Sequence, residues 1–231
     1  TFRSLPRGEK IRIKDKSTYQ KGIVELNKVR VYIMKTKRLK RFIYSFFVYS
    51  MAVQTIMLVA VYFGTKEVNW GEGANSKMGL IIGILLIQLI AIPGAILLSK
   101  LSKIKGNLFA LKLVVFIWIL LCLSALLVYE PIHFYLISGF VGLVMGGIQS
   151  LSRSTFSKYI PSGTKDTSSF FSFYDISEKL GIVIGMFSYG FIEQITGSMR
   201  NSIVALVVFF VVGLLLLFQV PKEEISIENY G

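Results

Sequence analysis

The feature that most constrains this chain is the grouping of its apolar residues into long blocks instead of amphipathic periods. Hydrophobic residues make up 53% of the 231 positions. A helix needs roughly 20 residues to cross about 30 Å of hydrocarbon. Six stretches are long enough, at positions 42–63, 78–98, 107–129, 132–150, 170–192 and 203–220. The blocks therefore predict an all-α integral membrane protein with six transmembrane helices.

Positive charge is concentrated on one side of the predicted membrane. The net charge is +13, and 14 of the 26 Lys and Arg residues precede the first span. The loops around 98–106 and 151–168 add six more, whereas the opposite loops hold only Lys66, Lys77 and Arg200. The positive-inside rule places both ends of the chain in the cytoplasm. A membrane-facing arm accounts for this charge, so we expect a lipid bilayer and no nucleic acid as a partner.

The pattern divides the chain into three parts. Residues 1–41 read as a cytoplasmic linker, in which apolar residues between Ile23 and Ile33 recur every three or four positions among Lys and Arg. This pattern is typical of a basic amphipathic helix at the headgroup level, or of a simple connector to the first span. Residues 42–220 form the predicted bundle, and residues 221–231 a cytoplasmic tail.

The fifth predicted span carries three ionisable residues within five positions: Asp175, Glu178 and Lys179. A charge at bilayer depth costs several kcal/mol unless it is paired or lines a wet cavity. Asp175 and Lys179 are four residues apart with the acid first, which favours a helical ion pair. Either they neutralise one another, or one of them is shared with a solute, a proton or another part of a transporter.

The segment 142–161 (GLVMGGIQSLSRSTFSKYIP) is the most distinctive motif. On a helix, Gln149 and Arg153 share a face, with Gln149 one turn deeper in the membrane. Arg153 is interpreted either as an anchor that snorkels to the interface or as the partner of an acid on the next helix, such as Glu178. Gln149 and Gln54 each fall in the first helix of a three-helix unit, and repeated units are typical of secondary transporters.

The sequence shows no group of residues typical of an enzyme active site or a metal site. His133 is the only histidine and Cys122 the only cysteine, and no carboxylate cluster accompanies either of them. Zinc sites need several such ligands together. We therefore expect no enzymatic activity, no metal and no cofactor.

The chain resembles a known family through four segments: residues 46–64 (FFVYSMAVQTIMLVAVYFG), GGIQSLSRSTFSKYIP, FFSFYDISEKLGIVIG and FIEQITGSMR. They are similar to the C-terminal half of the unknown-major-facilitator family, which groups with the autophagy-linked vacuolar amino-acid effluxers in the major facilitator superfamily. The resemblance implies two three-helix repeats, a partner in the N-terminal six-helix half of the same protein, and alternating access. It also implies that the first helix of each repeat lines the cavity, so that the solute-facing candidates are Tyr49, Ser50, Gln54, Met145 and Gln149.

These patterns together predict a secondary active transporter for a small polar solute, with amino-acid efflux as one possibility, in a bacterial inner membrane. Asp175 is predicted to act as a gate latch. Glu178 and Lys179 are predicted to form an internal ion pair, either by themselves or shared with Arg153. The alternative from another class is a non-transporting membrane scaffold or receptor that anchors the basic arm.

Overall fold

The structure of the chain is a computed structural model that describes residues 16–71, 76–161, 164 and 167–221. The described residues form helices and no β-strand. The first 15 residues of the predicted linker and residues 222–231 of the predicted tail lie outside them. The helices are α1 (Lys16–Lys35), α2 (Lys37–Glu67), α3 (Ser76–Lys105), α4 (Asn107–Ala125), α5 (Pro131–Tyr159), α6 (Thr167–Thr196) and α7 (Met199–Phe218).

The six predicted spans correspond to α2 through α7, with shifted ends. The third span ends at Ala125 instead of residue 129, and α5 continues nine residues past its apolar stretch to Tyr159. Five helices, α2 to α5 and α7, are long and apolar enough to cross a membrane. α6 is as long as α3 but is not one of these five, and Asp175, Glu178 and Lys179 interrupt its apolar stretch. The part of the chain that the structure describes is thus helical, and its length and composition are those of a multi-pass membrane protein.

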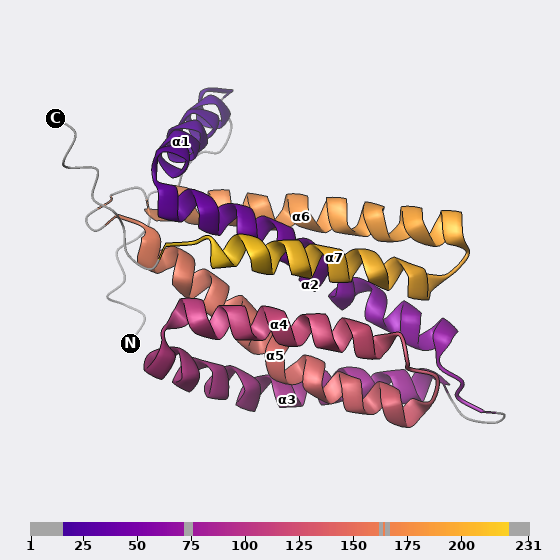
Figure 1. Cartoon of the computed structure of the whole chain (residues 1–231). Coiled ribbons are helices and arrows are strands. Elements are labelled where there is room, and N and C mark those ends of the chain that lie inside the picture. Colours follow the sequence, from indigo (N-terminus) through magenta and orange to yellow (C-terminus); the bar gives the residue numbers. More distant parts are fainter. Residues whose placement is uncertain (1–15, 72–75, 162–163, 165–166, 222–231) are drawn as a thin grey trace, which may run out of the picture.

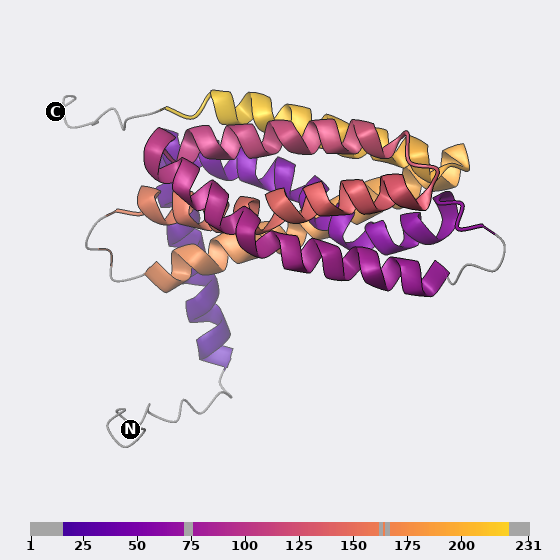
Figure 2. The same ribbon diagram turned by 90° about the horizontal axis from the view of Figure 1, so that it is seen from below.

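The helices pack side by side in a bundle (Figures 1 and 2), with α3 along α5, α4 against α5 and α7, and α2 against α6 and α7. Glycines allow the closest approaches. A Cβ on Gly142 would lie 2.5 Å from the carbonyl oxygen of Ile87, and one on Gly146 would lie 2.7 Å from that of Ala91. Small residues at such contacts let helix backbones pack tightly within a membrane.

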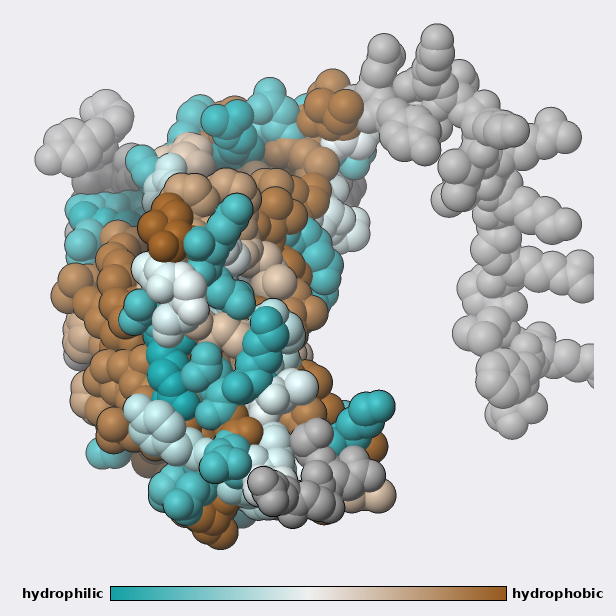
Figure 3. Space-filling view, turned by 90° about the vertical axis from the view of Figure 1, so that its right-hand side faces the viewer, coloured by the Kyte–Doolittle hydropathy of each residue, from teal (hydrophilic) through white to brown (hydrophobic). Residues whose placement is uncertain are grey.

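The interior of the bundle is aromatic and aliphatic. Trp118 and Phe210 stack with their ring centroids 5.5 Å apart, and both are buried. Large apolar side chains also cover much of the outside, for example Leu89 on α3 and Phe187 on α6. Viewed from the end that holds the α2–α3 and α6–α7 connections, hydrophilic residues gather on the end face and hydrophobic residues on the flanks (Figure 3). This distribution suits a bilayer around the flanks.

Arg200 lies at the start of α7, at the end of the bundle that holds the α2–α3 and α6–α7 connections. Its Nε donates to the Glu67 carboxylate at 2.8 Å, and its two terminal nitrogens each donate at 2.6 Å to the carbonyls of Leu126 and Val128. The guanidinium also lies 4.0 Å from the ring centroid of Tyr129. One side chain at the start of α7 therefore ties together the ends of α2 and α4.

The basic helix before the bundle differs in its boundaries from the prediction. α1 ends at Lys35, and Thr36 adopts an extended conformation before α2 begins at Lys37. Val29 and Ile33, which belong to the predicted apolar stripe, are buried. Tyr32 packs edge-on against Phe170 of α6 with 5.7 Å between ring centroids. The apolar face of α1 thus contacts the bundle.

Candidate functional site

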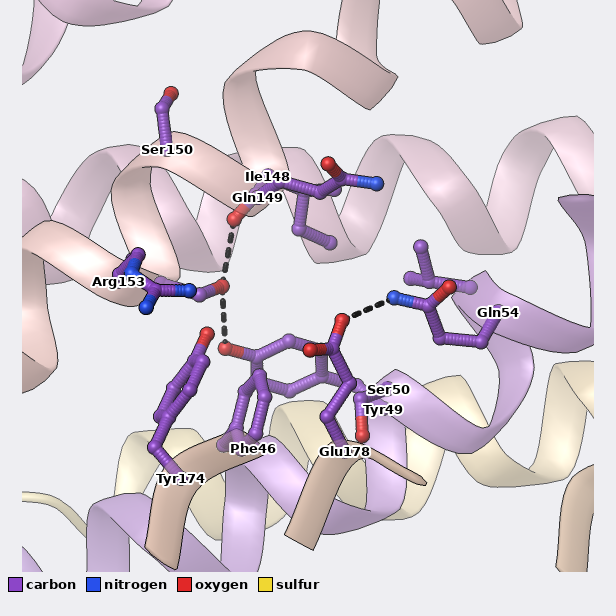
Figure 4. Close-up of a pocket in the computed structure, with 12 residues that line it drawn as sticks. Phe46, Tyr49, Ser50, Gln54, Ile148, Gln149, Ser150, Arg153, Tyr174 and Glu178 are labelled. Atoms are coloured by element: carbon purple, nitrogen blue, oxygen red, sulfur yellow. Dashed lines mark hydrogen bonds between the residues drawn. The ribbon is translucent and has the colours of Figure 1, made fainter. Parts of the chain in front are cut away.

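A cavity of about 270 Å³ lies between α2, α5 and α6, close to the middle of α2 (Figure 4). α2 and α5 contribute most of its wall, and α6 contributes two residues. Its lining is mixed, because aromatic rings alternate with amide, hydroxyl and charged groups. The lining residues are Phe46, Tyr49, Ser50, Val53, Gln54, Ile148, Gln149, Ser150, Ser152, Arg153, Tyr174 and Glu178.

A directed pair of hydrogen bonds fixes the Tyr49 hydroxyl. The Ser152 hydroxyl donates to the carbonyl of Ile148 at 2.6 Å. Because its single proton is used there, its oxygen accepts the hydrogen bond from the Tyr49 hydroxyl at 2.8 Å (Figure 4). Tyr49 is therefore the donor of this pair, and its phenolic oxygen is not used as an acceptor there.

Gln54 and Glu178 join α2 to α6 across the cavity. The amide nitrogen of Gln54 donates a short hydrogen bond to the Glu178 carboxylate (Figure 4). Both side chains are partly buried. A carboxylate can accept several hydrogen bonds, so this bond leaves capacity on Glu178 for a donor in the cavity.

Aromatic rings hold the other wall in place. Phe46 stacks on Tyr174 with 4.0 Å between centroids, and it meets Tyr49 edge-on at 5.7 Å. Phe156 packs against Tyr174 from behind at 5.0 Å. Such contacts restrict side-chain motion, so the polar tips of Tyr49 and Tyr174 have defined positions.

Arg153 lies at the rim of the cavity and pairs with Asp175 on α6. The guanidinium nitrogen is 3.2 Å from the carboxylate oxygen, and the two side chains are 54% and 46% exposed. The guanidinium also lies 5.0 Å from the ring centroid of Phe171. Exposed ion pairs contribute little to stability, so this one can open and close at small cost.

The predicted ion pair between Glu178 and Lys179 is not present in the structure. Adjacent residues on a helix point in different directions. Glu178 accordingly faces Gln54, while Lys179 is exposed and forms neither of the two ion pairs between described residues. The helical pair of Asp175 with Lys179 does not form either, because Asp175 reaches across to Arg153.

The predicted solute-facing residues divide into those that line the cavity and one that does not. Tyr49, Ser50, Gln54 and Gln149 line it, whereas Met145 packs against the apolar core. The hydroxyl of Ser50 donates to its own helix at the Phe47 carbonyl. The amide nitrogen of Gln149 lies 3.5 Å from the Met57 sulfur, a weak acceptor that leaves the amide available.

Sequence reasoning missed Ser152 and Tyr174. Both carried a usable signal, since Ser152 lies three residues after Gln149 and Tyr174 four residues before Glu178. Residues at these spacings share a helix face. Among the described residues, no three His, Cys, Asp or Glu side chains lie close enough together to bind a metal ion.

Comparison with known proteins gives this geometry a context. A family model described as "Vacuole effluxer Atg22 like" matches residues 1–228. The chain is 29% identical over 191 residues to "Uncharacterized MFS-type transporter YxiO" of Bacillus subtilis (strain 168), covering 83% of this chain and 43% of that protein. It is 29% identical over 199 residues to autophagy-related protein 22 of Vanderwaltozyma polyspora, covering 78% and 34%.

The yeast relatives extend this pattern. Autophagy-related protein 22 of Saccharomyces cerevisiae (strain S288c) is 26% identical over 191 residues, covering 78% of this chain and 34% of that protein. The chain thus spans less than half the length of these relatives. No solved structure matches the chain.

Proposed function

Because the chain belongs to the vacuole effluxer Atg22-like family, with an MFS-type transporter among its relatives, we propose that α2 to α7 form one half of a secondary active transporter. The observation that carries the proposal is the polar cavity between α2, α5 and α6. Transporters of repeated-helix architecture bind solute near the bilayer midplane, on helices that correspond between the repeats. In the proposed arrangement of two three-helix repeats, α2 and α5 are the first helix of each repeat.

The groups around the cavity favour a small zwitterion. Glu178 supplies a carboxylate for an ammonium group, and Arg153 at the rim supplies a guanidinium for a carboxylate. Gln54, Gln149 and Tyr49 add hydrogen-bonding groups of either polarity. A free amino acid carries both charges, so we propose amino-acid efflux as the activity, in keeping with the effluxer named in the family description.

Alternating access requires a second half that closes over the cavity. The relatives are more than twice as long as the aligned region, and we propose that an N-terminal six-helix half of the same protein completes the site. In this arrangement α6 crosses the membrane as the fifth helix of its half, and its charged residues lie toward the cavity and the interface between halves. Asp175, at the rim, serves as a latch of the inner gate.

The charge distribution supports a definite topology. The end of the bundle with α1, the α3–α4 connection and the α5–α6 connection carries most of the Lys and Arg residues. We place this end in the cytoplasm. A bacterial inner membrane is the proposed location, in keeping with the Bacillus subtilis relative.

A transport assay tests the proposal. The full-length protein that carries this chain is reconstituted in liposomes, and uptake of a neutral amino acid, a sugar and an organic cation is measured with and without a proton gradient. We expect amino-acid transport that falls roughly tenfold or more in Gln54→Ala, because a hydrogen bond to a charged group is lost. Ser172→Ala, an exposed α6 site outside the cavity, is the matched control.

The same assay addresses the alternative from another class. A scaffold or receptor would move none of the three solutes, and Gln54→Ala would leave its biological phenotype intact. Deletion of the basic arm before Phe42 would instead abolish that phenotype.

A further inference from the structure

A second polar pocket lies at the basic end of the bundle. It is enclosed by the α3–α4 connection and by the ends of α2, α5 and α7, and its volume is about 950 Å³. We call it the basic pocket. Its lining residues are Arg38, Ser99, Ser102, Lys103, Lys105, Gly106, Asn107, Leu108, Phe109, Lys112, Ser154, Thr155, Lys158, Tyr159 and Phe218.

Among the residues that the structure describes, the lining contains five cations and no carboxylate side chain. The cations come from four different helices, so the fold and not a single basic run brings them together. Like charges held this close repel one another, and an anion in the pocket would relieve that repulsion.

Arg38 is positioned to bind such an anion. Its guanidinium lies 4.1 Å from the ring centroid of Tyr159, and this contact fixes the orientation of the guanidinium plane. Its Nε is buried and has no hydrogen-bond partner in the structure. An unsatisfied buried donor costs free energy, and an oxygen of a bound anion would remove that cost.

The opposite wall is a connected polar row. Lys158 donates from Nζ to the side-chain oxygen of Asn107 at 2.9 Å, and the Asn107 amide donates to the Ser154 hydroxyl at 3.0 Å. At the edge of the pocket, Phe109 and Phe218 are 50% and 61% exposed. The pocket therefore combines fixed cationic donors with an adjoining apolar surface.

We propose that the basic pocket binds the phosphate group of an anionic membrane phospholipid. Arg38 and Lys158 hold the phosphate oxygens, and Lys103 and Lys105 add long-range attraction. The exposed rings of Phe109 and Phe218 favour a lipid over a soluble phosphate, because they offer a surface for acyl chains. Basic pockets between transmembrane helices on the cytoplasmic side are suited to such headgroups.

Lipid retention tests this proposal. The purified protein is exchanged into neutral detergent with equal amounts of phosphatidylglycerol and phosphatidylcholine, and bound lipid is counted by native mass spectrometry. We expect selective retention of phosphatidylglycerol, reduced roughly tenfold in Arg38→Gln/Lys158→Gln. Lys103→Gln/Lys105→Gln alters exposed side chains only and should reduce retention of phosphatidylglycerol about fivefold. This second variant keeps the test valid if Arg38→Gln/Lys158→Gln does not fold.

The control is Lys40→Gln/Lys100→Gln, which removes two charges at the same end of the bundle outside the pocket. It should change retention less than about twofold. An equal loss in control and pocket variants would overturn the proposal in favour of general surface charge. Displacement of the lipid by excess glycerol 3-phosphate at matched ionic strength would assign the pocket to soluble phosphates and contradict the proposal that it binds a lipid.

The chain itself offers one competing anion. Glu223 and Glu224 follow α7 in the sequence. If phosphatidylglycerol binds only to Glu223→Gln/Glu224→Gln and not to the wild-type protein, the acidic tail occupies the pocket and the proposal is wrong.

Discussion

At the scale of single residues, the hydrogen bond from Gln54 to Glu178 joins two helices beside the cavity. Glu178→Gln keeps an acceptor for the Gln54 amide but removes the negative charge, whereas Glu178→Ala removes both. We expect both variants to lose amino-acid transport roughly tenfold or more in proteoliposomes, because the ammonium group loses its counter-charge. Only Glu178→Ala should also lower stability, by about 1–2 kcal/mol in thermal unfolding, since it leaves the amide without a partner.

Lys179→Gln provides the control for the Glu178 variants. It changes the neighbouring charge on the same helix at an exposed position that does not line the cavity. Transport and unfolding temperature should both stay unchanged. Full transport by Glu178→Gln would show that the carboxylate charge has no part in solute binding.

Arg200 gives a second prediction at this scale. Its side chain is 17% exposed and bonds to Glu67 and to carbonyls at the ends of α2 and α4. Arg200→Ala should therefore lower the free energy of unfolding by about 3 kcal/mol, because it leaves Glu67 and several carbonyls unpaired. Glu67→Gln keeps the bonds from Arg200 to the carbonyls and should cost about 1 kcal/mol. Equal losses in the two variants, measured by thermal unfolding in detergent, would contradict this division.

Individual residues of the cavity could be predicted only in part. Gln54 and Gln149 could be found because amides are conspicuous within apolar spans. The partner of Glu178 could not be found from spacing along α6, since it lies on α2, 124 positions earlier. Met145 was misplaced because one position along a helix turns a side chain by about 100°.

At the scale of helices, the contact between α2 and α6 sets the width of the cavity. A Cβ on Gly185 would lie 2.6 Å from the Met51 carbonyl oxygen and would also clash with Thr55. Gly185→Ala should push α6 away from α2, weaken the bond between Gln54 and Glu178, and lower stability by about 1–3 kcal/mol, as overpacking does. Gly190→Ala, on the same helix with nothing within 4 Å, is the control and should be neutral or slightly stabilising. Equal thermal stability of the two variants would show that this contact is not tight.

The existence of the helices followed from block length, but their ends did not. Polar residues continue α5 beyond the C-terminal end of its apolar stretch and α6 beyond both ends of its stretch. A hydropathy pattern records only the part that suits hydrocarbon. Arg153, for this reason, lies within α5 although it falls outside the predicted span.

At the scale of the whole molecule, the sequence predicted the all-helical class but not the packing partners. α3 packs most extensively against α5, which follows it only after α4. This arrangement depends on glycine contacts such as Gly142 with Ile87, and one sequence does not reveal which small residues will meet. The cavity arises from the same arrangement, because α2, α5 and α6 come together only in the folded bundle.

The gate role proposed for Asp175 gives a prediction for the whole transporter. If the carboxylate latches the inner gate, Asp175→Asn should shift the full-length protein toward the cytoplasm-open state. In a Cys122→Ala background with Ser150→Cys in the cavity as reporter, labelling by an impermeant maleimide from the cytoplasmic side should become about fivefold faster, which corresponds to about 1 kcal/mol of coupling. The unfolding temperature should hardly change, because the ion pair with Arg153 is half exposed. Asp175→Glu keeps the carboxylate and should label like the parent. An unchanged rate in Asp175→Asn would leave Asp175 as a surface partner of Arg153 with no part in gating.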